Sequence, residues 1–311
     1  MKRITFLACL FVPIGLSQAQ PFLKNGDFSQ GANGMQYWTG SGNGGSSVTG
    51  QDLLANPVTE KFDTNGGGPS PAFSILPGRN RNPQPNPQTY TLQQAQVLFT
   101  PGPMEMHMDV CAICPNSNGQ GPYMKIMVAG QQVVSWTDFK GYFTAGTYRR
   151  HLTFVFTPPK SGPQTLTLEF WRDQYIWVYN PPYYTPKLVI DNIYLGPAQQ
   201  PVLRVQGERK LGGTLALELE GKVGNAAGIL LGLRKGPGLA IPGFTYTLQL
   251  DPTILIVLLG AGSFGTTGTY TLKVPVPNDP ALGGYPLPFQ GLGVGAAGGN
   301  FGLAHTLPLY P

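Results

Sequence analysis

The 311-residue sequence has little charge, little cysteine and little histidine, and each shortage excludes a class of protein. Only 11% of its residues are charged, and no run of Lys or Arg is interleaved with aromatics, so we expect no nucleic-acid partner. Its apolar runs are too short for a membrane span in the mature chain. The histidines, His107, His151 and His305, lie in separate strand-like segments, so a triad that used them would require a site between domains.

Motifs of common hydrolases are also missing. The sequence contains no G-x-S-x-G elbow and no H-E-x-x-H pattern. A glycosidase needs two carboxylates several ångströms apart, and the sequence singles out no pair among Asp109, Asp138, Glu169 and Asp173. A jelly-roll polysaccharide lyase would use a set such as Tyr148, Arg150 and His151. We expect a non-catalytic protein that requires no cofactor, with such a lyase or a glycosidase as the alternative.

The N-terminus has the features of a secretory signal peptide over residues 1–19. Two basic residues precede the apolar run Ile4–Leu16, and Ser17-Gln18-Ala19 fits signal peptidase with cleavage before Gln20. A lipid anchor at Cys9 is the weaker interpretation, because few apolar residues precede it. Removing the signal lowers the formal net charge from +5 to +3 by the loss of Lys2 and Arg3. We expect an extracellular protein, either released or held at the bacterial cell surface.

Glycine and proline are abundant, with 43 and 31 residues, and they separate runs rich in Val, Thr, Tyr, Phe and Leu. Both residues disfavour helix interiors and supply turns, so the composition predicts an all-β protein of many short strands. The length is enough for two hydrophobic cores. We expect a β-sandwich over residues 20–196, a linker over 197–201 and a second, smaller β-sandwich over 202–311.

The expected strands are alternating or continuous apolar runs bounded by turn residues. The apolar run Ile254–Leu259, between Pro252 and Gly260, is expected to be a buried central strand, whereas the Asn- and Pro-rich segment Arg79–Pro87 is expected to be a loop. The expected strands of the first domain are Thr89–Phe99, Met104–Val110, Tyr123–Val128, Gln132–Trp136, Tyr148–Phe156, Thr165–Trp171 and Leu188–Leu195. Those of the second are Gly213–Leu219, Ile229–Leu233, Phe244–Leu250, Thr253–Leu259, Thr269–Pro275 and Phe301–Leu309.

Two cysteines, Cys111 and Cys114, remain once the signal is removed. Their C-x-x-C spacing in an exported chain favours a local disulfide, with two buried thiols as the alternative. A strand would point the two residues to the same side only at even spacing, which counts against the disulfide. Zinc ligation is the weaker interpretation, because the three histidines are far apart in the sequence.

Four ordered segments resemble galactose-binding-like jelly-roll domains, which include carbohydrate-binding modules. The first, Asn25-Gly26-Asp27-Phe28-Ser29 followed by Trp38, is similar to the opening of these domains. The others are Gln94–Val97 with Thr100–Gly102, Met127–Val133, and the closing strand Val189–Leu195. The resemblance covers residues 22–196 and implies carbohydrate binding.

Many relatives in this family hold a structural calcium ion between their first and last strands. The resemblance places Asp27 and Asp191 at that site, but Ser29 stands where the family has an acidic ligand. Calcium takes six or more oxygen ligands, so the alternative is that Asp191 accepts backbone N–H bonds that close the sandwich.

The second domain is similar to C-terminal β-domains of secreted planctomycete-like and myxobacterial-like proteins. The matching residues are Leu211–Thr214, Leu230–Leu233 and Tyr270–Pro275. The resemblance implies an accessory or attachment module without activity.

An aromatic-rich stretch, Trp171–Tyr184, is the candidate ligand-binding segment. Sugar recognition needs flat rings beside amide, carboxylate or guanidinium groups, and this stretch offers both. The alternative is that one of its faces is core, as we expect for Trp38 and Trp136. The candidate contacts are Trp177, Tyr179, Tyr183 and Tyr184, with Arg172, Asp173 and Asn180 as hydrogen-bonding partners.

These features lead to two hypotheses. In the first, the protein is a secreted binding module that docks an extracellular glycan or polysaccharide. In the second, it is a structural cell-surface or matrix protein that contacts other proteins. An exposed aromatic pair beside polar groups favours the first, and an open strand edge or an apolar patch favours the second.

Overall fold

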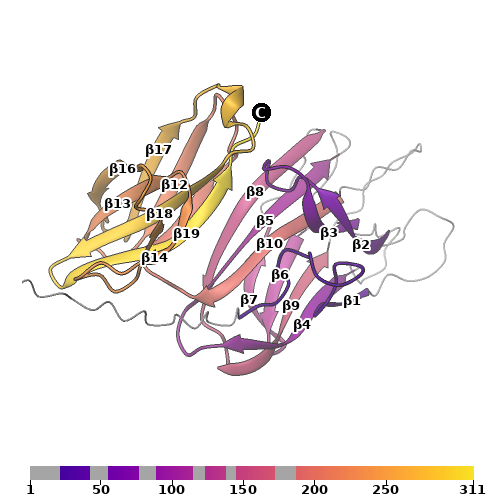
Figure 1. Cartoon of the computed structure of the whole chain (residues 1–311). Helices are drawn as coiled ribbons and strands as arrows, with labels where there is room; N and C mark the ends of the chain where they lie inside the picture. The colour runs from indigo at the N-terminus through magenta and orange to yellow at the C-terminus, as the bar shows by residue number, and fades with distance from the viewer. Residues whose placement is uncertain (1–21, 43–54, 77–88, 115–122, 138–144, 172–186) are drawn as a thin grey trace, which may run out of the picture.

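The computed structural model describes residues 22–42, 55–76, 89–114, 123–137, 145–171 and 187–311. Over these residues the fold is all-β, as expected, and its strands form two sandwiches that lie side by side (Figure 1). Among the described residues, no helix is both long enough and apolar enough to cross a membrane. The expected signal peptide lies outside the described residues.

The first sandwich consists of two five-stranded antiparallel sheets. One has the order β1-β4-β9-β6-β7 and the other β2-β3-β10-β5-β8. The strands are β1 (Thr39–Gly42), β2 (Ala55–Phe62), β3 (Ser70–Leu76), β4 (Tyr90–Phe99), β5 (Met104–Cys114), β6 (Tyr123–Val128), β7 (Gln131–Trp136), β8 (Gly146–Phe156), β9 (Gly162–Trp171) and β10 (Lys187–Pro197).

The second sandwich packs a three-stranded sheet, β11-β12-β17, against a four-stranded sheet, β16-β13-β18-β19, with β14-β15 as a separate pair. A 3₁₀ turn, η1, covers Pro280–Leu282. The strands are β11 (Val202–Gln206), β12 (Thr214–Glu220), β13 (Ala226–Gly232), β14 (Lys235–Leu239), β15 (Leu248–Leu250), β16 (Ile256–Ser263), β17 (Thr269–Pro275), β18 (Pro286–Gly295) and β19 (Gly298–Pro308).

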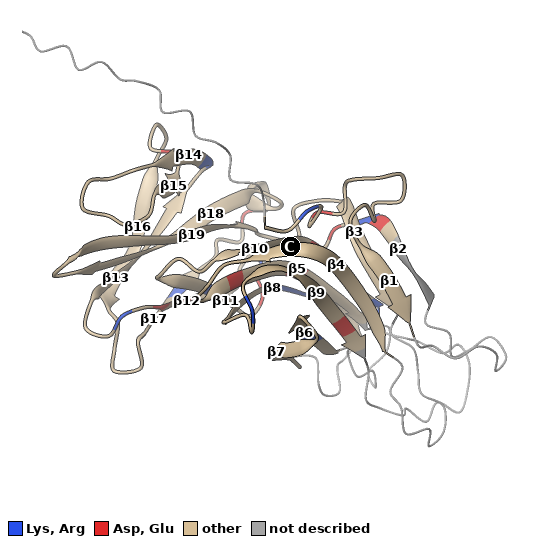
Figure 2. Ribbon diagram, turned by 90° about the horizontal axis from the view of Figure 1, so that it is seen from below, with Lys and Arg blue, Asp and Glu red and all other residues tan. Residues whose placement is uncertain are grey.

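Alternation along the strands builds the first core. In β9, Leu166, Leu168 and Phe170 are fully buried in the core between the sheets, while Thr167 and Glu169 point to the outer face. Trp38 and Trp136 are also core residues, as expected. Charged residues are scattered over both domains without a stripe of one sign (Figure 2), in keeping with the low charge content.

One strand prediction is wrong in its position. The run Ile254–Leu259 was expected to be a buried central strand, but β16 lies at the edge of its sheet. Leu255 and Leu258 are 64% and 54% exposed. A continuous apolar run does not distinguish a central strand from an edge strand, because the position depends on which strands pair beside it.

The opening and closing motifs of the first domain contact each other directly. Gly26 accepts a backbone hydrogen bond from Ile193 at 2.9 Å. Asn25 Nδ2 donates to the carbonyls of Gly34 and Gln36, and the backbone carbonyl of Asn25 accepts from the Trp38 indole at 2.9 Å. These hydrogen bonds hold the N-terminal segment, residues 25–38, against β10.

Replacing Gly26 with Ala is expected to destabilise this closure. An added Cβ would lie 1.9 Å from the Ile193 carbonyl oxygen, so the backbone of β10 or of the opening segment must move. We expect a loss of about 1–3 kcal/mol in the free energy of unfolding, measured by urea denaturation. Ala at Gly68 is not a clean control because its φ is +105°, whereas Gly146→Ala meets only ordinary contacts and should change stability little. Equal stability of the Gly26→Ala variant and the wild type would contradict the packing described here.

The two sandwiches contact each other through β11 and β8. Arg204 of β11 donates to the Thr153 carbonyl of β8 at 2.7 Å and pairs with Glu220 at 2.7 Å. This contact sets the face of β5 and β8 against the C-terminal strand β19.

Candidate functional site

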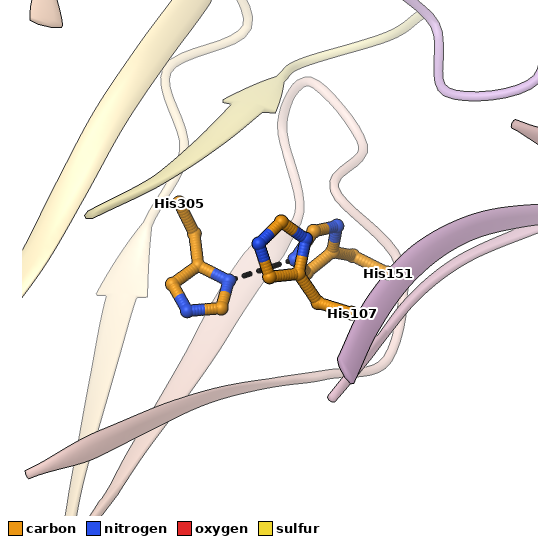
Figure 3. A group of neighbouring side chains, drawn as sticks. All are labelled: His107, His151 and His305. Atoms are coloured by element: carbon orange, nitrogen blue, oxygen red, sulfur yellow. Dashed lines mark hydrogen bonds between the residues drawn. The ribbon is translucent and has the colours of Figure 1, made fainter. Parts of the chain in front are cut away.

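All three histidines of the chain meet where the two sandwiches join. His107 comes from β5, His151 from β8 and His305 from β19, and Figure 3 shows the three rings gathered together. Each ring offers a nitrogen, and these nitrogens lie within 4.8 Å of one another. The histidines are far apart in the sequence, which made zinc the weaker interpretation, but the fold brings all three together.

Strand alternation explains how β5 supplies this site. Met104, Met106 and Met108 are fully buried in the core of the first sandwich. The intervening residues Glu105, His107 and Asp109 therefore point to the opposite face, toward the second domain. Asp109 lies directly across from His151 in the β5–β8 register. The alternating sequence M-E-M-H-M-D was the signal that could have indicated a polar buried face.

A chain of hydrogen bonds crosses the domain joint. Asp109 Oδ1 lies 2.9 Å from His151 Nδ1, and His151 Nε2 lies 2.9 Å from His305 Nδ1. Asp109 Oδ2 accepts from the amides of Asn65 and Asn192, both at 3.0 Å. On the far side, Glu105 Oε1 lies 3.2 Å from His305 Nε2, without hydrogen-bond alignment.

Burial and charge act in opposite directions on these groups. Burial raises the pKa of Asp109, but the His151 hydrogen bond and the Arg209 charge outweigh it and lower the pKa to about 2. Burial lowers the pKa of His151 to about 4 and holds the pKa of His107 well below its usual value. At neutral pH the carboxylate is therefore charged, and the His107 and His151 rings are neutral.

Arg209 supplies a buried positive charge next to Asp109. Its side chain is fully buried, and its Nη2 lies 3.8 Å from Asp109 Oδ1. Among the described residues, none of its side-chain nitrogens has a hydrogen-bond partner. The negative charge of Asp109 therefore offsets part of the free-energy cost of burying this guanidinium.

A pocket of about 610 Å³ opens beside the histidines, between the two domains. His107, Asp109 and His151 line it from the first domain, together with Asn65 and Asn192. The second domain contributes Lys235, Pro286, Thr306 and Pro308.

The predicted ligand-binding residues fall elsewhere. Trp177, Tyr179, Tyr183, Tyr184, Arg172, Asp173 and Asn180 lie outside the described residues, between the end of β9 at Trp171 and the start of β10 at Lys187. They remain predictions.

The predicted calcium ligands occupy different environments. Asp27 is exposed and accepts from the Ser29 hydroxyl at 3.0 Å. Asp191 is fully buried, where its Oδ2 accepts from the Ser70 hydroxyl at 2.5 Å and its Oδ1 from the Asn192 N–H at 2.7 Å. Burial raises the pKa of Asp191 to about 7. Asp191 therefore accepts one backbone N–H bond, from its neighbour Asn192, and one hydroxyl bond from β3, and the calcium site and its alternative both stay predictions.

Both cysteines lie in β5. Cys111 is buried beside Ala72 and Val189, and the side chain of Cys114 lies outside the described part of the chain. The register with β8 is continuous from Cys111 to Cys114. Residues three apart in a regular strand alternate between faces, so the strand does not favour the disulfide, which remains a prediction.

Among the described residues considered for an enzyme, His151 and Asp109 meet, whereas Arg150 and Glu169 have other partners. His151 bonds to Asp109, whereas Arg150 pairs with Glu208 at 3.3 Å. Glu169 pairs with Lys125 at 3.2 Å on the outer face of the other sheet. Asp138 and Asp173 lie outside the described residues.

Comparisons with known proteins show fold likeness alone. No protein family and no curated protein matches the sequence. Among solved structures, a carbohydrate-binding module, TmCBM61 in complex with β-1,4-galactotriose, matches at 14% identity and a TM-score of 0.36, over 58% of this chain and 99% of that chain. The adhesin domain of Epf from Streptococcus pyogenes matches at 10% identity and a TM-score of 0.27, over 88% and 91%. A Paenibacillus xanthan lyase matches at 14% identity and a TM-score of 0.29, over 72% of this chain and 25% of that chain. Similarities of this size do not say what this chain binds.

Proposed function

We propose that this is a secreted carbohydrate-binding protein, and that the first sandwich holds the glycan on the outer face of the sheet β1-β4-β9-β6-β7, near the end of β9. A row of polar side chains on this face carries the proposal. Thr91 of β4, Glu169 of β9 and Lys125 of β6 lie side by side in the strand register. Hydroxyl, carboxylate and ammonium groups are the partners that sugar hydroxyls need.

The polar row lies next to the strand end from which the aromatic sequence begins. Glu169 is two residues before Trp171, the last residue of β9, and Trp171 pairs with Tyr123 at the start of β6. The chain then continues into the aromatic stretch that ends at Tyr184. Aromatic rings of that stretch would add a stacking surface beside Thr91, Glu169 and Lys125, which offer none.

Glycan binding by the full chain is expected to depend on both parts of this site. Isothermal titration against a panel of soluble polysaccharides, β-1,4-galactan among them, should give saturable binding. Trp177→Ala and Glu169→Gln should each weaken it by about 10- to 100-fold, which corresponds to a lost stacking contact or a lost charged hydrogen bond. Tyr285→Ala, at an exposed tyrosine of the second domain, is the control and should bind as the wild type does.

The circular dichroism spectrum of each variant establishes that it is folded. A folded wild-type chain that binds no polysaccharide would remove the proposal. Binding that both site variants retain in full would move the glycan to another surface.

A second candidate function, protein–protein contact at a surface or matrix, has one observation in its favour. Strand β16 is a sheet edge that exposes Val257 and Leu258, and Leu255 just before the strand is exposed as well. Exposed apolar edges are sites where another chain adds to a sheet. This function takes first place if the polysaccharide panel gives no binding.

A further inference from the structure

We propose that His107, His151 and His305 bind one zinc-class divalent metal ion at the domain joint, with a fourth coordination position that faces the interdomain pocket. This site is separate from the glycan site, and neither proposal depends on the other. Three observations support this proposal: nitrogens of the three rings lie within 4.8 Å of one another, His107 Nδ1 has no hydrogen-bond partner among the described residues, and His107 and His151 line the pocket.

Carboxylates lie beside the outer nitrogens of two of the rings. Asp109 Oδ1 is 2.9 Å from His151 Nδ1, and Glu105 Oε1 is 3.2 Å from His305 Nε2 without hydrogen-bond alignment. The inner nitrogens, His151 Nε2 and His305 Nδ1, face each other 2.9 Å apart, at hydrogen-bond distance.

Without a metal ion, a proton on one of the two inner nitrogens joins the pair. A metal ion would replace that proton and bind both inner nitrogens, while the outer nitrogens stay beside their carboxylates. Histidine ligands in metal sites regularly donate their second ring nitrogen to a carboxylate, and His151 and Asp109 have this arrangement.

His107 supplies the third ligand. Its Nδ1 is buried and has no hydrogen-bond partner among the described residues. Its ring stacks on Tyr194 at 4.6 Å between ring centroids and lies 4.7 Å from the His305 ring. The ring is held in place by packing, and a metal ion satisfies its nitrogen.

Two carboxylates and two cationic side chains surround the three rings. Glu105 and Asp109 are buried, Arg209 lies 3.8 Å from Asp109, and Lys235 lines the pocket. Imidazole-only ligand sets suit zinc and neighbouring transition metals rather than calcium or magnesium. Metal sites with three protein ligands and an open position bind water or a small anionic ligand at the fourth position. His107 and His151 line the pocket, which supplies the room for that ligand.

Zinc binding by the untagged full chain tests the proposal. After chelator treatment and dialysis, competition with a chromophoric chelator should give one zinc ion per chain. His107→Asn should weaken the affinity at least 100-fold, and Glu105→Gln, which removes a carboxylate beside a ligand, should weaken it about 10- to 100-fold. Thr266→Val, at an exposed threonine of the second domain outside the pocket lining, is the control and should stay within twofold of the wild type.

His107→Asn is the preferred variant because His107 Nδ1 has no hydrogen-bond partner among the described residues, so the fold should persist. Cobalt(II) added to the wild type should give the visible spectrum of a tetrahedral site, and His305→Asn should abolish that spectrum. A folded wild type that takes up less than stoichiometric zinc overturns the proposal. Zinc affinity that is unchanged in folded His107→Asn overturns it as well.

Discussion

Asp109→Asn is expected to lower the free energy of unfolding by about 3–5 kcal/mol, the cost of removing one partner from a buried charge pair. The substitution removes the negative charge next to the buried Arg209. It also disrupts the hydrogen bonds, because Asp109 faces donors on both sides: His151 at Oδ1, and Asn65 and Asn192 at Oδ2. An amide has one oxygen and cannot accept from both sides. Urea denaturation measures the change.

A double substitution separates charge from packing. Arg209→Met in the Asp109→Asn background removes the uncompensated guanidinium, so part of the lost stability should return. Asp27→Asn, at an exposed carboxyl, is the control and should change stability by less than about 0.5 kcal/mol. A loss below about 1 kcal/mol for Asp109→Asn would show that the polar joint is not formed as described.

Phe73→Ala is expected to lower the stability of the first sandwich by about 3–5 kcal/mol. Phe73 is fully buried in β3, and the rings of Phe28, Tyr90 and Phe170 surround it at centroid distances of 5.7, 6.0 and 6.2 Å. The cavity left by the ring cannot close without movement of three other aromatic residues.

Hydrogen exchange locates this effect. Protection should fall in β3 and β10 and should persist in β12 and β17, because the second sandwich has its own core. Leu98→Ala, at a half-exposed position in the same sandwich, is the control and should change stability little. Equal loss of protection in β12 and β17 would mean that the sandwiches unfold as one unit.

Much of the fold follows from sequence periodicity. The bounds of β6 and β17 match the sequence prediction at both ends, because alternating apolar residues are bounded there by turn residues. Strands β2 and β3 were not predicted. Strand β3 contains Pro71, and β2 contains Pro57, residues that count against a strand in a reading of the sequence alone.

Sequence periodicity could not predict the histidine cluster. Alternation in β5 places Glu105, His107 and Asp109 on one face, but it does not say what covers that face. His305 is 154 residues from His151, and the two meet only because the second sandwich docks β19 against β5 and β8. Sequence spacing cannot report a contact that depends on how two domains are placed.

Anomalous diffraction at the zinc edge is the most direct test of the central claim, that the domain joint holds a metal ion between its three histidines. Crystals of the untagged chain grown with zinc should give an anomalous peak at a coordination distance of about 2.0–2.1 Å from one nitrogen each of His107, His151 and His305. A zinc-containing crystal with no peak at the joint, and with the His151–His305 hydrogen bond intact, would contradict it.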